Sequence, residues 1–303
     1  MIKNGGEESM KNISLEIKDL TKYYGNVKGV ENVSLSLREG EIFGFIGPNG
    51  AGKSTTIRCI MNLINKTSGS VKIFNKVFTG NEKEIKEKIG YLPSEIALYD
   101  DLSVKAMLDY HEKFYERKVH KRREELVKIL KLDESKNVED LSLGNLKKLG
   151  IILAMMHEPK LIILDEPTSG LDPIMQNIFY NLLLEEKKKG TTIFYSTHIL
   201  TEVSKICDRV GIIRNGKLIK EEKIEELLKK NLTYVTITSD KIDEILDELG
   251  QSVIEKKAGI AKVANKLNHN ELIKILSKYP IEKVLIEEPA LEDLFMHYYE
   301  EEQ

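Results

Sequence analysis

The sequence lacks tryptophan and has little of several features that would narrow the class of protein. Its two cysteines, Cys59 and Cys207, lie in apolar, helix-like contexts without the spacing of a disulfide or metal motif. Both are expected to be buried free thiols in a reducing compartment. The six histidines are scattered and predict no metal cluster. The net charge of −3 supplies no basic field, so no nucleic-acid partner is expected.

Long apolar runs are also missing. The longest, residues 149–156, is far shorter than the roughly 20 residues that cross a bilayer. Residues 1–12 are polar and contain glycine, which predicts a loose tail and no signal peptide. Any work at a membrane is therefore expected to need a separate partner protein.

Strand and helix patterns alternate over the first two thirds of the chain. The patterns predict strands at 13–17, 33–37, 42–46, 69–74, 161–164 and 192–195, and helices at 55–61, 102–115, 121–130, 172–189 and 199–207. Ser103 is the expected N-cap of one helix, and Asn215-Gly216 predicts a hairpin turn. Such alternation favours an α/β fold with a largely parallel sheet and a ligand at the carboxyl ends of the strands.

The composition shifts at about residue 221. A charged helix is expected at 221–230, followed by a strand at 233–237, a helix at 242–249, strands within 252–263 and a helix at 271–279. The chain is therefore divided into a tail (1–12), a nucleotide-binding domain (13–222, with a helical insertion at about 95–148) and a small α+β domain (223–303).

A glycine-rich loop fits the phosphate-binding pattern of two glycines five residues apart, followed by Lys-Ser. Its backbone N–H groups can point at one anion at a helix N-terminus. Lys53 can reach the β- and γ-phosphates, and Ser54 can offer its hydroxyl to Mg²⁺. A glycine-rich turn without a ligand is the weaker alternative. The expected nucleotide-binding residues here are Gly47, Pro48, Asn49, Gly50, Ala51, Gly52, Lys53, Ser54 and Thr55.

An apolar strand later in the chain ends in two carboxylates, Asp165 and Glu166. Asp165 is expected beside the loop, where it can hold Mg²⁺ through its water shell. Glu166 can orient and deprotonate an attacking water, which makes it the expected catalytic base. The alternative is a surface Asp-Glu pair after a core strand.

The pentapeptide Leu141 to Asn145 resembles the signature motif of ABC ATPases, usually Leu-Ser-Gly-Gly-Gln. The resemblance implies that Ser142 and the N–H of Gly144 bind the ATP held by a second subunit. A serine N-cap without a ligand is the alternative. The likeness extends over about residues 13–220 and implies an ABC ATPase core with an antiparallel β subdomain and a helical insertion.

Three more positions match the family. Asp172 stands in a segment similar to the D-loop of the dimer seam, so it too is expected to act in trans. His198 stands in a segment similar to the switch, whose histidine contacts the γ-phosphate, and is taken as catalytic. Tyr24 stands where an aromatic ring stacks on adenine, with Tyr23 as its rival.

Two departures from the family pattern affect the expected rate of hydrolysis. Ser94 replaces a glutamine that contacts Mg²⁺ and the attacking water, so that either a water bridges the gap or Glu95 takes part. Leu143 and Asn145 replace glycine and glutamine in the signature, and Leu143 would crowd the phosphate if it pointed inward. Hydrolysis is expected to be slowed or retuned but not abolished.

The end of the chain, residues 287–295, resembles the tail of ATPase subunits of type-2 ABC exporters, and the two variant motifs are similar to those of multidrug and antimicrobial-peptide export relatives. The implied protein hydrolyses ATP with Mg²⁺, pairs with a second copy and drives an integral membrane subunit from the cytoplasmic face. A soluble ABC ATPase of translation or DNA processes, or an importer ATPase, is the alternative.

Overall fold

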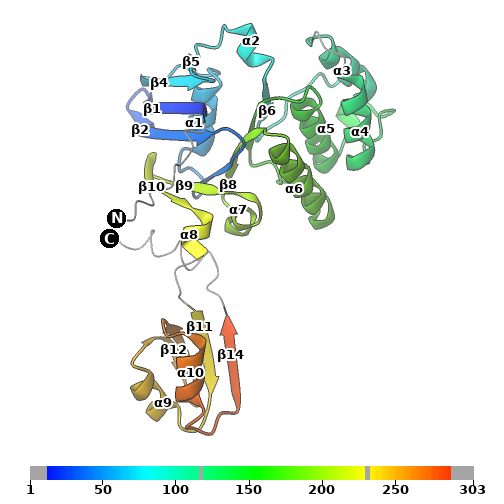
Figure 1. Cartoon of the computed structure of the whole chain (residues 1–303). Helices are drawn as coiled ribbons and strands as arrows, with labels where there is room; N and C mark the ends of the chain where they lie inside the picture. Colours follow the sequence, from blue (N-terminus) through cyan, green and yellow to red (C-terminus); the bar gives the residue numbers. More distant parts are fainter. Residues whose placement is uncertain (1–11, 116–118, 229–232, 288–303) are drawn as a thin grey trace, which may run out of the picture. The chain divides into compact units, whose positions relative to one another are not determined.

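A computed structural model of the chain describes residues 12–115, 119–228 and 233–287. It divides into two compact units, Met1–Lys223 and Ile224–Gln303 (Figure 1). All but the last residue of the expected tail (1–12) and all but the first residue of the exporter-like segment (287–295) lie outside the described residues.

The first unit is built on a six-stranded sheet in the order β10-β9-β3-β8-β7-β6. Its central strands are parallel and almost wholly buried, because runs such as Leu161 to Leu164 are apolar on both faces. The predicted largely parallel sheet is therefore confirmed. The strands are β3 (Ile42–Ile46), β6 (Ile89–Leu92), β7 (Leu161–Asp165), β8 (Thr192–Thr197), β9 (Arg209–Arg214) and β10 (Lys217–Lys223).

Three helices follow the central strands in the chain. Helix α1 (Lys53–Ile60) follows β3, α6 (Pro173–Lys188) follows β7 and α7 (Leu200–Ile206) follows β8. Asp172 begins α6 as an N-cap, since its Oδ1 accepts a hydrogen bond of 2.9 Å from the N–H of Met175. The phosphate-binding loop and the Asp-Glu pair therefore both stand at the carboxyl ends of parallel strands.

A second sheet of this unit is antiparallel, in the order β2-β1-β4-β5. Strands β1 (Ile13–Tyr24) and β2 (Val27–Arg38) are longer than predicted, because register shifts interrupt the apolar alternation that the sequence pattern needs. Buried side chains of β1, β2 and β4 (Ser68–Ile73) pack with those of α1 and β3 in one apolar core, while the short β5 (Lys76–Val77) is exposed and pairs with β4. The predicted antiparallel subdomain is confirmed.

The helical insertion comprises α3 (Val104–Glu112), α4 (His120–Leu130) and α5 (Leu143–Met155), after the short α2 (Lys83–Lys86). Figure 1 shows it on the opposite side of the first unit from the antiparallel sheet. Ser103 caps α3 as predicted, accepting a 3.1 Å bond from the N–H of Ala106. Cys59 and Cys207 are buried free thiols, also as predicted.

The second unit is a four-stranded antiparallel sheet in the order β12-β13-β11-β14 with two longer helices, which confirms the predicted α+β fold. Its chain order is that of a split β-α-β motif. The elements are α8 (Ile224–Leu228), β11 (Thr233–Thr238), α9 (Ile242–Leu249), β12 (Ser252–Lys257), β13 (Ile260–Asn265), α10 (His269–Leu276) and β14 (Lys283–Glu287).

The predicted helix at 221–230 was wrong at its start. Residues 221–223 continue β10, and helix α8 begins only at Ile224. Glu221 lies opposite Gly211 of β9, and its carboxylate accepts a 2.6 Å bond from Arg209. This cross-strand ion pair overrides the helical preference of a charged run, because strand pairing depends on residues that are distant in sequence.

Close packing of β6 on α5 gives a test of this fold. A Cβ at Gly90 would lie 2.0 Å from the carbonyl oxygen of Ala154. We expect Gly90→Ala to lower the free energy of unfolding by about 3 kcal/mol or more, measured by urea denaturation. Gly25→Ala is the control. It has open space and φ +59°, so its cost should be only about 1 kcal/mol. Equal losses for the two variants would contradict the assigned packing.

Candidate functional site

The phosphate-binding loop joins β3 to α1 and has steric reasons for two of its glycines. A Cβ at Gly47 would lie 2.3 Å from the carbonyl oxygen of Ile213. Gly52 has φ +109°, and a Cβ there would lie 2.6 Å from Val30. Pro48, Asn49 and Gly50 are exposed. The loop therefore presents main chain outward while its two ends are packed against neighbouring strands.

Lys53 extends back into this loop. Its side chain is only 5% exposed, and Nζ donates to the carbonyl oxygens of Gly47 (2.8 Å) and Pro48 (3.2 Å). Nζ also lies 3.4 Å from Oε1 of Glu166. The ammonium is thus fixed at the loop, on the side where the strand-end carboxylates lie.

The two carboxylates at the end of β7 have different surroundings. Asp165 is buried and accepts a 2.8 Å bond from the hydroxyl of Ser196. Glu166 is partly exposed, and its Oε1 lies 3.2 Å from Nδ1 of His198. The predicted Lys53, Glu166 and His198 therefore meet, although they come from three separate motifs.

Glu166 has a left-handed backbone, with φ +47°. A non-glycine residue there costs about 1–2 kcal/mol, so the surrounding contacts must hold it. Its N–H donates to the carbonyl oxygen of Ser196 (3.1 Å), and its own carbonyl accepts from the N–H of Ser169 (3.4 Å). The turn directs the Glu166 carboxylate toward Lys53 and His198.

Ser54 and Asp165 are the predicted metal ligands. A hydroxyl and a carboxylate oxygen suit Mg²⁺, which usually takes one or two protein ligands beside phosphate oxygens and water. Among the described residues, no group of three or more His, Cys, Asp and Glu side chains could hold a metal without such help. The donor set fits a metal bound together with a nucleotide.

The signature segment begins α5. Ser142 is the exposed N-cap, and its Oγ accepts a 3.4 Å bond from the N–H of Asn145. Leu143 is 64% exposed and lies against the D-loop-like segment Ser169 to Pro173, called the D-loop below, since a Cβ at Gly170 would be 2.9 Å from its Cγ. Gly144 is close to the same loop, because its Cβ would lie 2.9 Å from the carbonyl oxygen of Gly170.

The two tyrosines have different environments. Tyr23 donates a 2.7 Å hydrogen bond to Glu31. Tyr24 is 46% exposed, and Lys22 lies over its ring at 4.9 Å. A Cβ at Gly29 would touch both Tyr24 and Thr55, so the Tyr24 ring lies beside the start of α1. This geometry favours Tyr24 over its rival.

The carboxylate of Asp172 has a structural role within this chain, because it caps α6 by accepting a hydrogen bond from the N–H of Met175. Its carboxylate is exposed at the D-loop, next to the signature segment. The trans roles of Ser142, Gly144 and Asp172 stay predictions, because each would act on a nucleotide of a second chain.

Sequence reasoning missed two buried ionisable residues that bind the segments around the predicted site. Lys147 of α5 is 2% exposed and donates to the carbonyl oxygens of Ser94 (3.1 Å) and Glu166 (3.4 Å). Burial lowers its pKa, and the charges of Asp165 and Glu166 oppose that shift. A signal was available, since helical spacing puts Lys147 on the same face as the fully buried Ile151.

Glu202 of α7 is the second missed residue, at 3% exposure. Its carboxylate accepts hydrogen bonds of 2.6–3.1 Å from four hydroxyls, those of Thr168, Tyr180, Tyr195 and Thr197. These partners come from the loop after β7, from α6 and from β8, so no sequence spacing indicates the cluster. It holds together the segments that lead to the D-loop and to His198.

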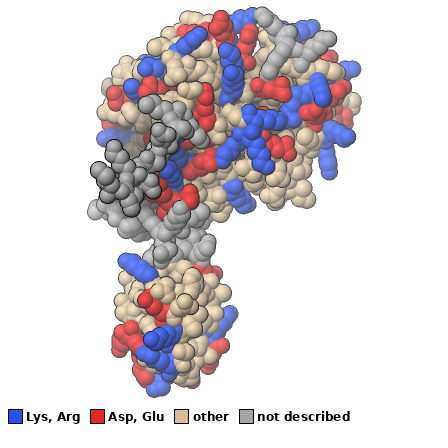
Figure 2. All heavy atoms as spheres, in the orientation of Figure 1, with Lys and Arg blue, Asp and Glu red and all other residues tan. Residues whose placement is uncertain are grey.

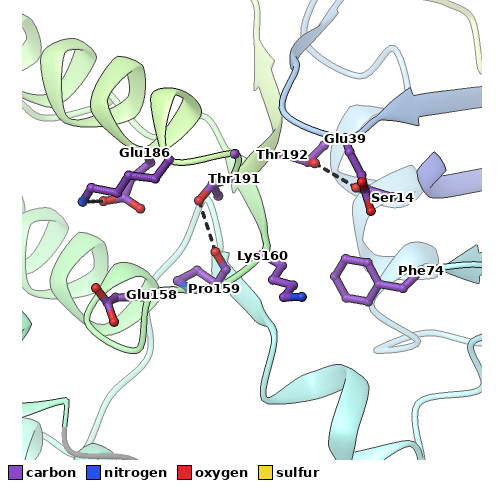
Figure 3. Close-up of a pocket in the computed structure, with 11 residues that line it drawn as sticks. Ser14, Glu39, Phe74, Glu158, Pro159, Lys160, Glu186, Thr191 and Thr192 are labelled. Carbon is purple, nitrogen blue, oxygen red and sulfur yellow. Dashed lines mark hydrogen bonds and ion pairs between the residues drawn. The ribbon is translucent and has the colours of Figure 1, made fainter. Parts of the chain in front are cut away.

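A separate hollow of about 420 Å³ lies at the amino ends of β7 and β8 (Figure 3). Ser14 and Thr192 share a 2.8 Å hydrogen bond there, and Thr191 donates to the carbonyl oxygen of Pro159. Ligands of open α/β sheets bind at the carboxyl ends of the strands, so this hollow is not taken as the functional site.

Comparison with known proteins agrees with this geometry. Residues 30–169 match the family described as ABC transporter. The chain is 36% identical, over 298 residues, to the bacitracin transport ATP-binding protein BcrA of Bacillus licheniformis. The aligned region covers 93% of this chain and 96% of the relative. The chain belongs to the ABC transporter ATP-binding proteins.

Two further similarities extend this ABC assignment. The linearmycin resistance ATP-binding protein LnrL of Bacillus subtilis is 38% identical over 68% of this chain and 68% of its own length. A solved dimeric post-hydrolysis structure of the ATP-binding cassette MJ0796, bound to ADP and Pi, is 26% identical with a TM-score of 0.63. It covers 69% of this chain and 98% of that one. The protein is an ATP-binding subunit of an ABC transporter and an ATPase, with the predicted ABC fold.

None of the described helices is both long enough and apolar enough to span a bilayer.

The four-hydroxyl cluster of Glu202 gives a test of local stability. Glu202→Gln replaces one carboxyl oxygen, which accepts hydrogen bonds, by an amide NH₂ group that cannot accept them, so we expect it to lower the free energy of unfolding by about 1–3 kcal/mol in urea denaturation. Glu185→Gln, at an exposed position on α6, is the matched control and should change it by less than about 0.5 kcal/mol. A Glu202→Gln variant as stable as this control would contradict the cluster.

Proposed function

We propose that this ABC ATP-binding protein drives an exporter, and that two copies pair head to tail around two ATP molecules. The observation that carries the proposal is the meeting of Lys53, Glu166 and His198 within 3.2–3.4 Å. One chain thereby supplies a phosphate-binding cation, a general base and a polar imidazole. In this proposal the signature of the partner copy adds a second set of phosphate donors at that point.

Each residue has a role in this proposal. The N–H groups of the loop 47–55 and the ammonium of Lys53 bind the phosphates, and Tyr24 stacks on adenine. Glu166 accepts the proton of the attacking water, while His198 orients Glu166 and contacts the γ-phosphate. Ser54 and Asp165 would hold Mg²⁺, which neutralises phosphate charge when it is bound.

The second copy completes the site through Ser142, Gly144 and Asp172. Support comes from two exposed apolar side chains beside these residues, Leu143 (64% exposed) and Ile174 (74% exposed), which a partner surface would cover. A similar cassette has a solved dimeric structure. ATP shared between the copies adds contacts that exist only in the closed dimer, so it shifts the population toward that state.

The departures at Leu143 and Ser94 are compatible with hydrolysis. The Leu143 side chain packs against Gly170 of the D-loop, so in this proposal it does not crowd the phosphate. The main-chain oxygen of Ser94 is bound by Lys147, and Glu95 is exposed. Hydrolysis slowed or retuned, but not abolished, remains our hypothesis.

A membrane subunit is the proposed partner, docked on the helical insertion at the cytoplasmic face. A hollow of about 350 Å³ between β6, α3 and α5 includes Pro93 and Met107 in its lining. Next to it lie the exposed rings of Tyr99, Tyr110 and Phe114, stacked edge to face at 5.8 and 5.1 Å. Aromatic rings in this arrangement suit a protein interface.

Export as the direction rests on the relatives named for bacitracin transport and linearmycin resistance, and on the tail motif. An importer ATPase is the rival within the family. A translation or DNA-related ABC ATPase is disfavoured, because the net charge is −3 and because acidic and basic side chains are interspersed on the face drawn in Figure 2.

The dimer scheme predicts opposite effects at two residues. Glu166→Gln should give a stable ATP-bound dimer at saturating Mg-ATP, because nucleotide binds but the base is lost. Lys53→Ala should weaken ATP binding at least about tenfold, because the buried ammonium is removed. Light scattering after size exclusion and nucleotide titration measure the two effects. A monomeric Glu166→Gln protein would count heavily against head-to-tail pairing.

The docking proposal is tested on the exposed rings. The double variant Tyr99→Ala/Phe114→Ala should retain ATP-dependent dimerisation but lose most of its co-purification with its co-expressed membrane subunit, since two exposed aromatic anchors are removed. Val77→Ser, at an exposed apolar position on the antiparallel sheet, is the control and should co-purify normally. Normal recovery of the double variant would exclude this surface.

A further inference from the structure

The side chain of Lys147 is only 2% exposed, and its ammonium group has three N–H donors. Such a side chain is rarely buried without specific partners. Its partners here are two main-chain carbonyl oxygens, those of Ser94 (3.1 Å) and Glu166 (3.4 Å). The bonds are therefore directed at backbone positions, and the carboxylate of Glu166 stays with Lys53 and His198.

These two carbonyls belong to the segments that determine hydrolysis in the proposed function. Ser94 follows β6 at the position where the family pattern was found to depart, and Glu166 is the proposed base after β7. The backbone of Glu166 is left-handed and depends on its hydrogen bonds to Ser196 and Ser169. Lys147 adds a bond from a different element, because it comes from α5.

Helix α5 is the helix that begins at the signature. Lys147 follows the N-cap Ser142 by five positions, which is about one and a half turns. The first turn of α5 also contacts the D-loop through Leu143 and Gly144. The signature helix is therefore joined to the base at two points, at its start through the D-loop and further along through Lys147.

We propose that Lys147 is a positioning residue, which fixes the main chain of Glu166 and Ser94 to the signature helix so that turnover depends on it while ATP binding does not. The inference rests on the proposed function, because it takes Glu166 as the base. Lys147 exchanges no proton in this role and acts through the position of Glu166. In the head-to-tail dimer it would join the base of one ATP site to the signature that serves the other.

The test is Lys147→Met in the full-length protein. Methionine has a similar length but no charge and no N–H donor, so it should fit the site without holding either carbonyl. We expect kcat for ATP hydrolysis to fall at least about tenfold, because small displacements of a base are costly, while KM for ATP changes by less than about twofold. Lys148→Met, at the neighbouring and partly exposed lysine of α5, is the matched control and should retain the wild-type kcat.

A second measurement separates positioning from folding or binding. The double variant Lys147→Met/Glu166→Gln should still form the ATP-bound dimer seen by light scattering, because ATP binding is not expected to need Lys147. Loss of that dimer, or a Lys147→Met kcat within twofold of the Lys148→Met value, would overturn the inference. If wild-type protein has no turnover under conditions where Glu166→Gln dimerises, the proposed function fails, and the inference falls with it.

Discussion

The carboxylate of Glu166 lies between the ammonium of Lys53 and the imidazole of His198, and the described site depends on that contact. It exists because β3, β8 and β7 are neighbours in one parallel sheet, so their carboxyl ends meet at one edge. Each strand contributes one group through the loop that follows it. The left-handed turn at Glu166 is the local distortion that brings its carboxylate toward the other two.

Buried polar side chains hold these loops in place around the site. Glu202 accepts hydrogen bonds from four hydroxyls in the segments next to Gly170 and His198, and Lys147 donates to the main-chain carbonyls of Ser94 and of Glu166, the proposed base. Burying a charge is costly unless it is hydrogen-bonded, so these contacts are specific in geometry. These buried contacts leave the signature segment exposed, and it is the surface that the proposed second copy would complete.

Much of the fold followed from local patterns. Apolar runs identified the parallel strands, and Ser103 marked the start of α3. The change in composition indicated the α+β fold of the second unit. Two expectations failed where distant residues compete with local preference. Register shifts concealed the length of β1 and β2, and a cross-strand bond to Arg209 kept Glu221 in β10.

The sequence by itself predicted which residues carry the chemistry, because a phosphate-binding loop, a strand-end Asp-Glu pair and a signature serine each have a fixed local spacing. Tertiary structure alone decided how these residues meet, that Leu143 turns toward Gly170, and that Tyr24 lies beside Thr55. It also decided that Lys147 and Glu202 are buried among partners from several elements. Such contacts depend on strand order and helix packing, which bring together residues that no short pattern relates.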